Sequence, residues 1–358
     1  MHAQKSHTFR RRLIPLATVA LTLGAMVGGA QLATNNGASA KPTASSAALP
    51  AAAAPTGSTV AVNKNADATT AYWTKAKTKA AEELIPTRTD AQGSSYGTAA
   101  LDFTRSRITP QSANISAPYR TTGKIFFTQP GVGDFQCSGA VVGARVVITA
   151  AHCINSGHGF YTNWVFIPAY DGSKPTLATQ RPLGTWTWAS AEIPTNWLTT
   201  NGSLPNATDF GAIVFGDQSF SGGPLLKLYQ KAGKYPVATG HLFDTHVTML
   251  GYPCNFDSCN IMQRVDSSDH RVPPGYTGGN AYEYGSDMTG GSSGGPWLEN
   301  FGTGAAPQGS WTTRNAVVGV TSYIYTDGGA SLIEGASQLD SRWTTVYNNR
   351  CAAAAGNC

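Results

Sequence analysis

The sequence predicts an all-β protein with a double-barrel architecture, and two observations carry this prediction. Beyond residue 116, short runs of β-branched and aromatic residues alternate with turns that contain Gly or Pro. In the same region almost no stretch shows the 3.6-residue periodicity of a helix. Many short strands joined by such turns are typical of barrels and sandwiches.

The expected strands follow in order from the start of this region. The first covers 123–128, and two β-branched runs around a Gly143-Ala144-Arg145 turn form a hairpin over 137–153. Further strands are expected at 164–167, 210–215, 237–240, 247–253 and 317–323. Residues 338–347 are a candidate for one short helix near the C-terminus, of the kind usual in the family that the motifs described below resemble.

Residues 1–40 have the features of a secretory signal peptide. A basic start precedes an apolar stretch at 13–30, and Ala38-Ser39-Ala40 fits a small-residue cleavage site. No later stretch is long and apolar enough to span a membrane. We therefore expect a secreted, extracellular protein without a membrane partner.

Residues 41–115 are interpreted as a propeptide or a flexible N-terminal segment. Residues 41–57 are rich in Ala, Pro, Ser and Thr, and a helical patch at 67–85 ends before Pro86. The polar stretch that follows contains three candidate processing points, Arg88, Arg105 and Arg107. A disordered linker without an inhibitory role is the alternative interpretation.

The charge distribution argues against a nucleic-acid partner. The whole chain carries a formal net charge of +5, but residues 1–115 hold 12 of its 25 basic and only five of its 20 acidic residues. Residues 116–358 therefore carry a net charge of −2, and their basic residues are scattered. Nucleic-acid binding proteins gather Lys and Arg into a patch or stripe, which is not seen here.

The stretch that carries chemistry is 287–297, a turn with four glycines in six residues and Ser293 at its centre. Glycine loses the most backbone entropy on folding, so such a run indicates a sharp bend rather than a helix or strand. A serine in this setting is able to act as a nucleophile, and free backbone N–H groups beside it are able to hold an oxyanion.

This turn resembles the G-x-S-G-G-P motif of the chymotrypsin-like (trypsin-fold) serine peptidases. The resemblance implies that Ser293 is the nucleophile and that the N–H groups of Gly291 and Ser293 form the oxyanion hole. A second motif, T-A-A-H-C at 149–153, places His152 as the general base. Asp209, followed by an apolar strand, resembles the acid of the family's third motif. The order His, Asp, Ser excludes subtilisins and α/β-hydrolases.

The resemblance spans roughly residues 119–347 and is nearest to secreted bacterial trypsin-like and glutamyl-endopeptidase-like members. It implies two six-stranded antiparallel β-barrels, at 116–245 and 246–349, and a tail at 350–358. The implied function is a serine endopeptidase that acts as a monomer on protein or peptide substrates, without a cofactor. The alternative is a protease-like protein that has lost activity and only binds.

Six cysteines in an exported chain suggest three disulfides. Cys137 and Cys153 have the spacing of the bridge that, in the family, pins the histidine loop. Their proximity in the sequence suggests two further pairs, Cys254–Cys259 and Cys351–Cys358. No cysteine or histidine spacing suggests zinc, so no metal site is expected.

The resemblance also identifies the residues of the specificity pocket. Asp287, six residues before the nucleophile, would lie at the base of the pocket and favour Arg or Lys by charge pairing. Thr321 stands where glutamate-specific members have a histidine; Ser322 and Tyr323 follow it, and Ile324 would narrow the mouth of the pocket. The pattern points away from glutamate, and both basic and small or apolar residues stay open.

One departure from the animal trypsin-like zymogens concerns activation. These enzymes carry an Asp just before the nucleophile, which pairs with a newly cut N-terminus. Here that position is Ser292, which has no charge. We therefore expect that activation by this ion pair does not occur.

Overall fold

The structure is a computed structural model that describes residues 57–88, 101–243, 245–302, 304, 306–307, 312–325 and 332–358. The predicted signal peptide at 1–40 lies outside these residues, as do 41–56 of the N-terminal segment. Within the described ranges, no helix combines the length and the apolar character needed to cross a membrane.

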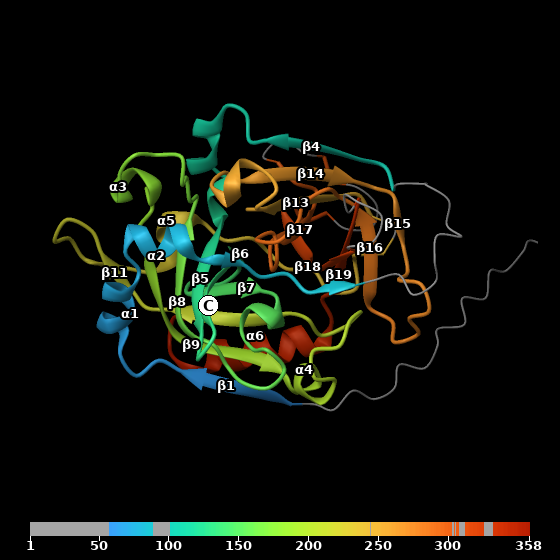
Figure 1. The fold of residues 1–358 in the computed structure, drawn as a ribbon, viewed down its shortest axis with the longest axis horizontal. Helices are drawn as coiled ribbons and strands as arrows, with labels where there is room; N and C mark the ends of the chain where they lie inside the picture. Colours follow the sequence, from blue (N-terminus) through green and yellow to red (C-terminus); the bar gives the residue numbers. More distant parts are fainter. Residues whose placement is uncertain are drawn as a thin grey trace, which may run out of the picture. The chain divides into compact units, whose positions relative to one another are not determined.

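The first sheet closes into a six-stranded barrel (Figure 1). Its strands are β5 (Thr122–Gln129), β6 (Gly133–Val141), β7 (Val146–Thr149), β8 (Thr162–Pro168), β9 (Trp186–Pro194) and β10 (Gly211–Phe215). They run in the order β9-β10-β7-β6-β5-β8, and pairing of β8 with β9 closes the ring. Large apolar side chains fill the interior, among them Trp164 and Phe166 of β8, which are fully buried.

The second sheet is antiparallel and curled. Its strands are β13 (Val247–Gly251), β14 (Gln263–Ser267), β15 (His270–Arg271), β16 (Ala281–Gly285), β17 (Pro296–Glu299), β18 (Ala316–Tyr325) and β19 (Ile333–Gln338). Among the described residues the order is β15-β16-β19-β18-β17-β13-β14, an open half-barrel. A separate cluster of buried apolar residues, which includes Met249, Tyr284 and Trp297, packs against this sheet. The predicted all-β double-barrel fold class is confirmed.

The chain ends in helix α6 (Ser341–Ala353), which is longer than the helix expected at 338–347. Asp340 caps it by accepting a hydrogen bond from the N–H of Arg342, and the side chain of Trp343, in its first turn, is buried. The other helices of the described barrels are short: α3 (Leu177–Gln180), α4 (Thr195–Thr199) and α5 (Leu228–Ala232). The strand expected at 237–240 is only one β-bridge, between Val237 and Val317.

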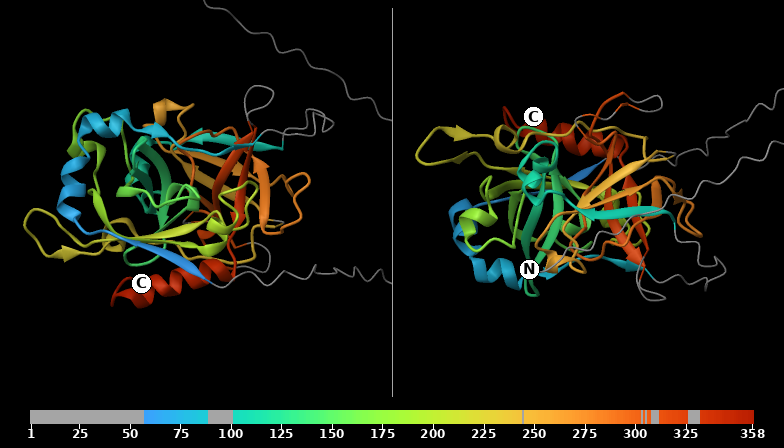
Figure 2. Two further views of the ribbon diagram at one scale, coloured as in Figure 1. Left: turned by 60° about the horizontal axis from the view of Figure 1, so that its bottom comes forward. Right: turned by 90° about the horizontal axis from the view of Figure 1, so that it is seen from above.

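The described parts of the N-terminal segment, 57–88 and 101–115, pack on both sheets, as two views in Figure 2 show. β1 (Ser58–Val62) adds to β9, and β4 (Phe103–Arg107) adds to β14. The helix expected at 67–85 is instead two short helices, α1 (Ala66–Tyr72) and α2 (Lys75–Ala80). The break lies at Trp73 and Thr74, because the Thr74 side chain caps α2 and Trp73 is buried against Phe126.

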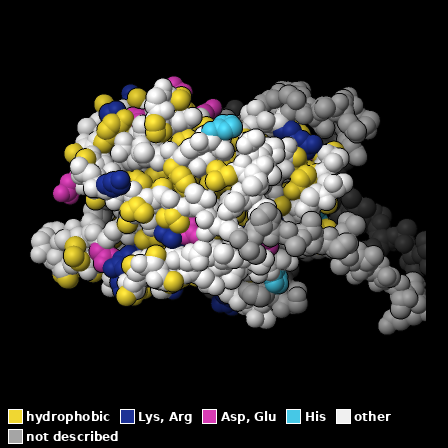
Figure 3. Space-filling model, turned by 90° about the horizontal axis from the view of Figure 1, so that it is seen from below, with side chains coloured by type: hydrophobic (Ala, Val, Ile, Leu, Met, Phe, Trp, Pro, Cys, Tyr) yellow, Lys and Arg dark blue, Asp and Glu magenta, His cyan; other side chains and the backbone are white. Residues whose placement is uncertain are grey.

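The structure contains the three disulfides suggested by the sequence: Cys137–Cys153, Cys254–Cys259 and Cys351–Cys358. On the face drawn in Figure 3, the Lys and Arg side chains are scattered and mixed with acidic ones.

Candidate active site

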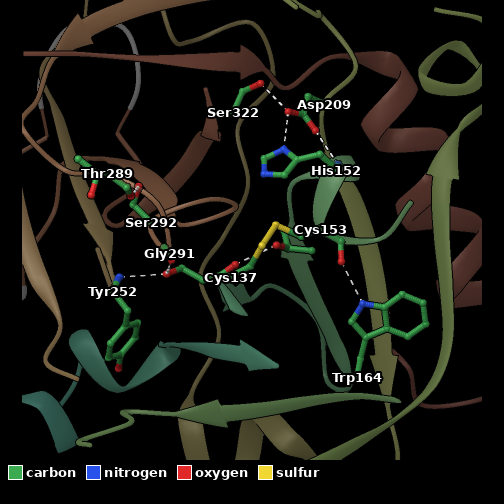
Figure 4. Close-up of a disulfide and its surroundings, with 12 residues drawn as sticks. Cys137, His152, Cys153, Trp164, Asp209, Tyr252, Thr289, Gly291, Ser292 and Ser322 are labelled. Atoms are coloured by element: carbon green, nitrogen blue, oxygen red, sulfur yellow. Dashed lines mark hydrogen bonds and ion pairs between the residues drawn. A yellow bond between two sulfur atoms is a disulfide. The ribbon is translucent and has the colours of Figure 1, made fainter. Parts of the chain in front are cut away.

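His152 and Asp209 meet on the first barrel. His152 lies in a 3₁₀ turn (Ala151–Cys153) directly after β7, and Asp209 lies two residues before β10. The His152 Nδ1 atom is 2.8 Å from Asp209 Oδ2, and the His152 backbone N–H donates to Asp209 Oδ1 at 2.9 Å (Figure 4). One carboxylate therefore fixes both the backbone and the ring of the histidine.

Asp209 is fully buried, and its carboxylate receives a third hydrogen bond from the second barrel. The Ser322 Oγ–H of β18 donates to Asp209 Oδ2 at 2.5 Å. Three donors satisfy a carboxylate that would otherwise be costly to bury. The hydroxyl of Ser322, a residue expected in the specificity pocket, is thus directed to Asp209.

The loop that carries His152 is held in place by a disulfide and by a hydrogen bond from a tryptophan. Cys153 forms the disulfide with Cys137 of β6, and its carbonyl accepts a hydrogen bond from Trp164 Nε1 at 3.0 Å (Figure 4). The short β-branched run of β7 then brings the loop to the end of the barrel. The sequence folds in this way because residues 146–149, Val-Val-Ile-Thr, are all buried.

Ser293 lies in a turn that forms backbone hydrogen bonds with both barrels. Its carbonyl accepts a hydrogen bond from the N–H of Ser138 at 2.7 Å, and the N–H of Gly294 donates to the Thr321 carbonyl at 2.8 Å. Gly294 has φ +73°, and a Cβ at this position would lie 2.0 Å from Thr149 Oγ1. Only glycine fits there, and this close approach brings Ser293 beside the loop of His152.

Several polar groups at this site have no partner among the described residues. Ser293 Oγ and His152 Nε2 are both buried and make no hydrogen bond there. The backbone N–H groups of Gly291 and Ser293 likewise donate to no described group. Gly291 has φ +92°, which L-residues rarely adopt. Among the described residues, a hydroxyl, an imidazole nitrogen and two N–H groups are thus left without a hydrogen-bond partner.

The residues expected in the specificity pocket have different surroundings. Thr321 Oγ1 accepts a hydrogen bond from Trp297 Nε1 at 2.9 Å. The Tyr323 hydroxyl donates to the buried Glu283 at 2.6 Å, and Ile324 is buried to 7 % exposure. Asp287 Oδ2 accepts a hydrogen bond from Arg105 Nε at 2.9 Å.

Arg105 is a partner of Asp287 that sequence reasoning missed. It belongs to β4 of the N-terminal segment, and its guanidinium also lies 3.6 Å from the centroid of the Phe256 ring. The charge of Asp287 is therefore paired within the chain. No local pattern pointed to this pair, because its members are 182 residues apart.

Glu334 on β19 is the second residue that sequence reasoning missed. It is fully buried, and its Oε1 atom lies 2.7 Å from Oγ of Ser292, the neighbour of Ser293. Burial raises the pKa of Glu334 to about 8. A buried acid thus touches the turn from the side of the second barrel.

Residues 82–88 of the N-terminal segment bridge the two barrels beside this turn. β2 (Glu82–Glu83) pairs with residues 135–136 of β6, and β3 (Thr87–Arg88) pairs with residues 324–325 of β18, both in parallel. Between them, the Pro86 carbonyl accepts a hydrogen bond from the N–H of Ile324 at 3.3 Å. The Glu83 side chain packs over Gly290, since a Cβ on this glycine would lie 2.8 Å from Glu83 Cδ.

Comparison with solved structures finds serine proteases. Protease Anisep from Arthrobacter nicotinovorans is 28% identical with a TM-score of 0.53, over 66% of this chain and 96% of that one. The thermostable serine protease AL20 from an extremophilic microorganism is 26% identical with a TM-score of 0.52, over 66% and 98%.

A Glu endopeptidase structure shares the fold at 17% identity and a TM-score of 0.51, over 71% of this chain and 99% of that one. No protein-family model matches the chain, and no curated protein sequence matches it.

Proposed function

Because the chain has the chymotrypsin-like serine peptidase fold and its structural neighbours are serine proteases, we propose that it is a secreted serine endopeptidase. In this proposal Ser293 is the nucleophile, His152 the general base and Asp209 the acid that orients it. One observation carries the assignment: Asp209 holds Nδ1 of His152, while Nε2 and the Ser293 hydroxyl make no hydrogen bond with any described residue or with each other.

The geometry gives each group its part in the reaction. Since Asp209 accepts the Nδ1 proton, the Nε2 lone pair of His152 is free to take the Ser293 proton as Oγ attacks the substrate carbonyl. The N–H groups of Gly291 and Ser293 then stabilise the oxyanion. The imidazolium gives its proton to the leaving amine, and water hydrolyses the acyl-enzyme by the same steps in reverse.

A fluorophosphonate probe tests the proposal and separates an enzyme from an inactive binder. We expect the processed wild-type protein to be labelled at Ser293 and to hydrolyse peptides, and Ser293→Ala and His152→Ala to lose hydrolysis. The exposed Ser221 offers a matched control, because Ser221→Ala removes a hydroxyl far from the turn in sequence. Normal turnover by folded Ser293→Ala protein would refute the assignment.

We further propose that the protein is made as a zymogen, with its N-terminal segment blocking the cleft. Residues 82–88 pair in parallel with the parts of β6 and β18 that extend beyond their neighbours β7 and β17, and pairing of an added strand with exposed backbone is a common mode of peptide recognition. With this segment in place, Ser293 is fully buried and His152 is only 4 % exposed. A substrate would have to displace these residues to reach the nucleophile.

Two anchors support a tightly held segment. Trp73 is buried, and its Nε1 donates to the Asn163 carbonyl at 2.6 Å. Arg88 donates to the Tyr325 hydroxyl at 2.9 Å and lies 3.7 Å from the buried carboxylate of Glu283. Removal of Arg88 should be costly, because the buried carboxylate of Glu283 then loses a neighbouring positive charge.

Probe labelling before and after processing tests the blockade. We expect slow labelling of the full-length secreted precursor and fast labelling after cleavage, with the active form beginning between about residue 87 and residue 120. Arg88→Ala should speed labelling of the precursor, whereas Lys64→Ala, a loss of charge at an exposed position of the same segment, should not. Equal labelling of precursor and processed protein, or an active protein that begins at Lys41, would contradict the proposal.

A further inference from the structure

The hydroxyl of Ser292 makes two contacts that need two protons. Its Oγ atom lies 2.7 Å from the Thr289 carbonyl and 2.7 Å from Glu334 Oε1 (Figure 4 shows the first). A hydroxyl carries one proton, and a carbonyl oxygen is only able to accept. If Ser292 donates to Thr289, the second contact is a hydrogen bond only when Glu334 supplies its own proton.

The surroundings of Glu334 favour this protonated form. The side chain is fully buried, and its Oε2 atom makes no hydrogen bond of normal geometry with the described residues; the hydroxyls of Ser292 and Ser286 lower the pKa of Glu334, but burial raises it by more. An ionised carboxylate with an unpartnered oxygen is expensive to bury, whereas the neutral acid is much less so. The nearby carboxylate of Asp287, itself paired with Arg105, also disfavours a second negative charge.

The turn that Glu334 touches is the one whose shape matters for the proposed reaction. Ser292 stands between Gly291 and Ser293, whose N–H groups would form the oxyanion hole. The N–H of Ser292 donates to the Thr289 carbonyl at 3.1 Å, and the Ser292 carbonyl accepts from the N–H of Gly295 at 2.8 Å.

We propose that Glu334 is a positioning residue which, as a neutral acid, donates a hydrogen bond to Ser292 and so fixes the turn between Gly291 and Ser293. This inference rests on the proposed serine endopeptidase function. Glu334 does not touch the substrate; it acts through Ser292. Its contribution should therefore appear in the rate of the chemical step, because a displaced oxyanion hole weakens binding of the transition state more than of the substrate.

Two substitutions of similar length separate a neutral donor from a charge. In Glu334→Gln, the amide group is still able to donate to Ser292 Oγ, whereas Glu334→Met offers no donor. With the processed enzyme and peptide substrates, we expect Glu334→Gln to keep kcat within about threefold of wild type. Glu334→Met should lose kcat about tenfold to a hundredfold with little change in KM, the size expected for a loosened oxyanion hole.

The pH profile gives a readout that packing alone would not change. Since the pKa of Glu334 lies at about 8, the acid ionises above this pH and stops donating. We expect kcat of the wild type to fall on the alkaline side and this fall to be absent in Glu334→Gln. Should Glu334→Met fail to fold, Ser292→Ala provides a second test, because without the Ser292 hydroxyl the ionisation of Glu334 should no longer change kcat, and the alkaline fall should be absent there too.

Other outcomes would overturn the inference. If Glu334→Gln loses as much kcat as Glu334→Met, a proton donor at this position is not what matters. If Glu334→Gln instead abolishes cleavage after Arg or Lys through KM, Glu334 is a charged specificity group. Failure of the proposed function itself is recognised separately, because the wild-type enzyme would then not react with the fluorophosphonate probe.

Discussion

Replacing Asp209 by Asn gives the sharpest test of the site, because the carboxylate and the amide have the same shape. The structure gives Asp209 three donors: the N–H and Nδ1 of His152, and the hydroxyl of Ser322. An amide has only one oxygen, so one of these donors must face an NH₂ group. If the NH₂ group faces Nδ1, the imidazole must take the other tautomer, and Nε2 then carries a proton and cannot act as a base.

The size of the effect follows from the contact between ring and carboxylate. During the reaction the imidazolium would lie 2.8 Å from a full negative charge. At an effective dielectric constant of about 20, this attraction is worth about 6 kcal/mol. Because each 1.36 kcal/mol is a factor of ten in rate, we expect Asp209→Asn to lower kcat about 10⁴-fold, the size known for a Ser-His-Asp protease.

The assay is kcat of the processed enzyme with a peptide substrate near neutral pH, with thermal unfolding as the control for folding. Ser322→Ala is the graded companion variant, because it removes one hydrogen bond to the carboxylate and leaves the charge. A hydrogen bond to a charged group is worth about 1.5–3 kcal/mol, so a loss of roughly tenfold to a hundredfold is expected. A folded Asp209→Asn enzyme within tenfold of wild type would show that the carboxylate does not orient His152 in catalysis.

Three other changes test the packing, a buried charge and the substrate preference. Gly294→Ala should lower the free energy of unfolding, measured in urea, by more than about 3 kcal/mol, since its Cβ would meet Thr149 Oγ1 at 2.0 Å. Gly131→Ala is the control, because Gly131 also has a positive φ but no neighbour within 4 Å, and it should cost only about 1–2 kcal/mol. Equal costs would contradict the clash. Burial lowers the pKa of Lys124 from 10.5 to about 7, so the folded state binds fewer protons than the unfolded state between these values. Stability should therefore rise with pH from 7 to 9 by up to about 2 kcal/mol in the wild type and not in Lys124→Met, and parallel pH curves would sink this reasoning. If release of Arg105 leaves Asp287 free to select cations, profiling of the processed enzyme with a peptide library should show cleavage after Arg or Lys that Asp287→Ser abolishes; an unchanged preference, or a strong preference for Glu, would argue against it.

The sequence by itself determined the fold class and three candidate residues of the site. Both follow from short contiguous stretches, in which neighbouring residues jointly specify a local shape. The T-A-A-H-C run after a buried hairpin and the glycine-rich turn around Ser293 are such stretches. The paired cysteines are also close in the sequence, at separations of 16, 5 and 7 residues, so their partners were suggested without a structure.

Only the tertiary structure decided which side chains surround these residues. Ser322 meets Asp209 across 113 residues, and Glu334 meets Ser292 across 42. Such contacts depend on how strands of the two sheets are aligned, and a shift by one residue turns every side chain to the other face of the sheet. The alternating pattern of each strand alone does not specify that alignment.

For the N-terminal segment too, the sequence indicated its general character, and only the tertiary structure showed its contacts. Its composition suggested a removable segment, and the sequence left open whether it is disordered or inhibitory. The parallel pairing of 82–83 with β6 and 87–88 with β18 depends on two strands that lie far from this segment along the chain. Exposed backbone N–H and C=O groups are able to pair with strands of many different sequences. The side chains of a short polar strand therefore do not indicate which strand it pairs with.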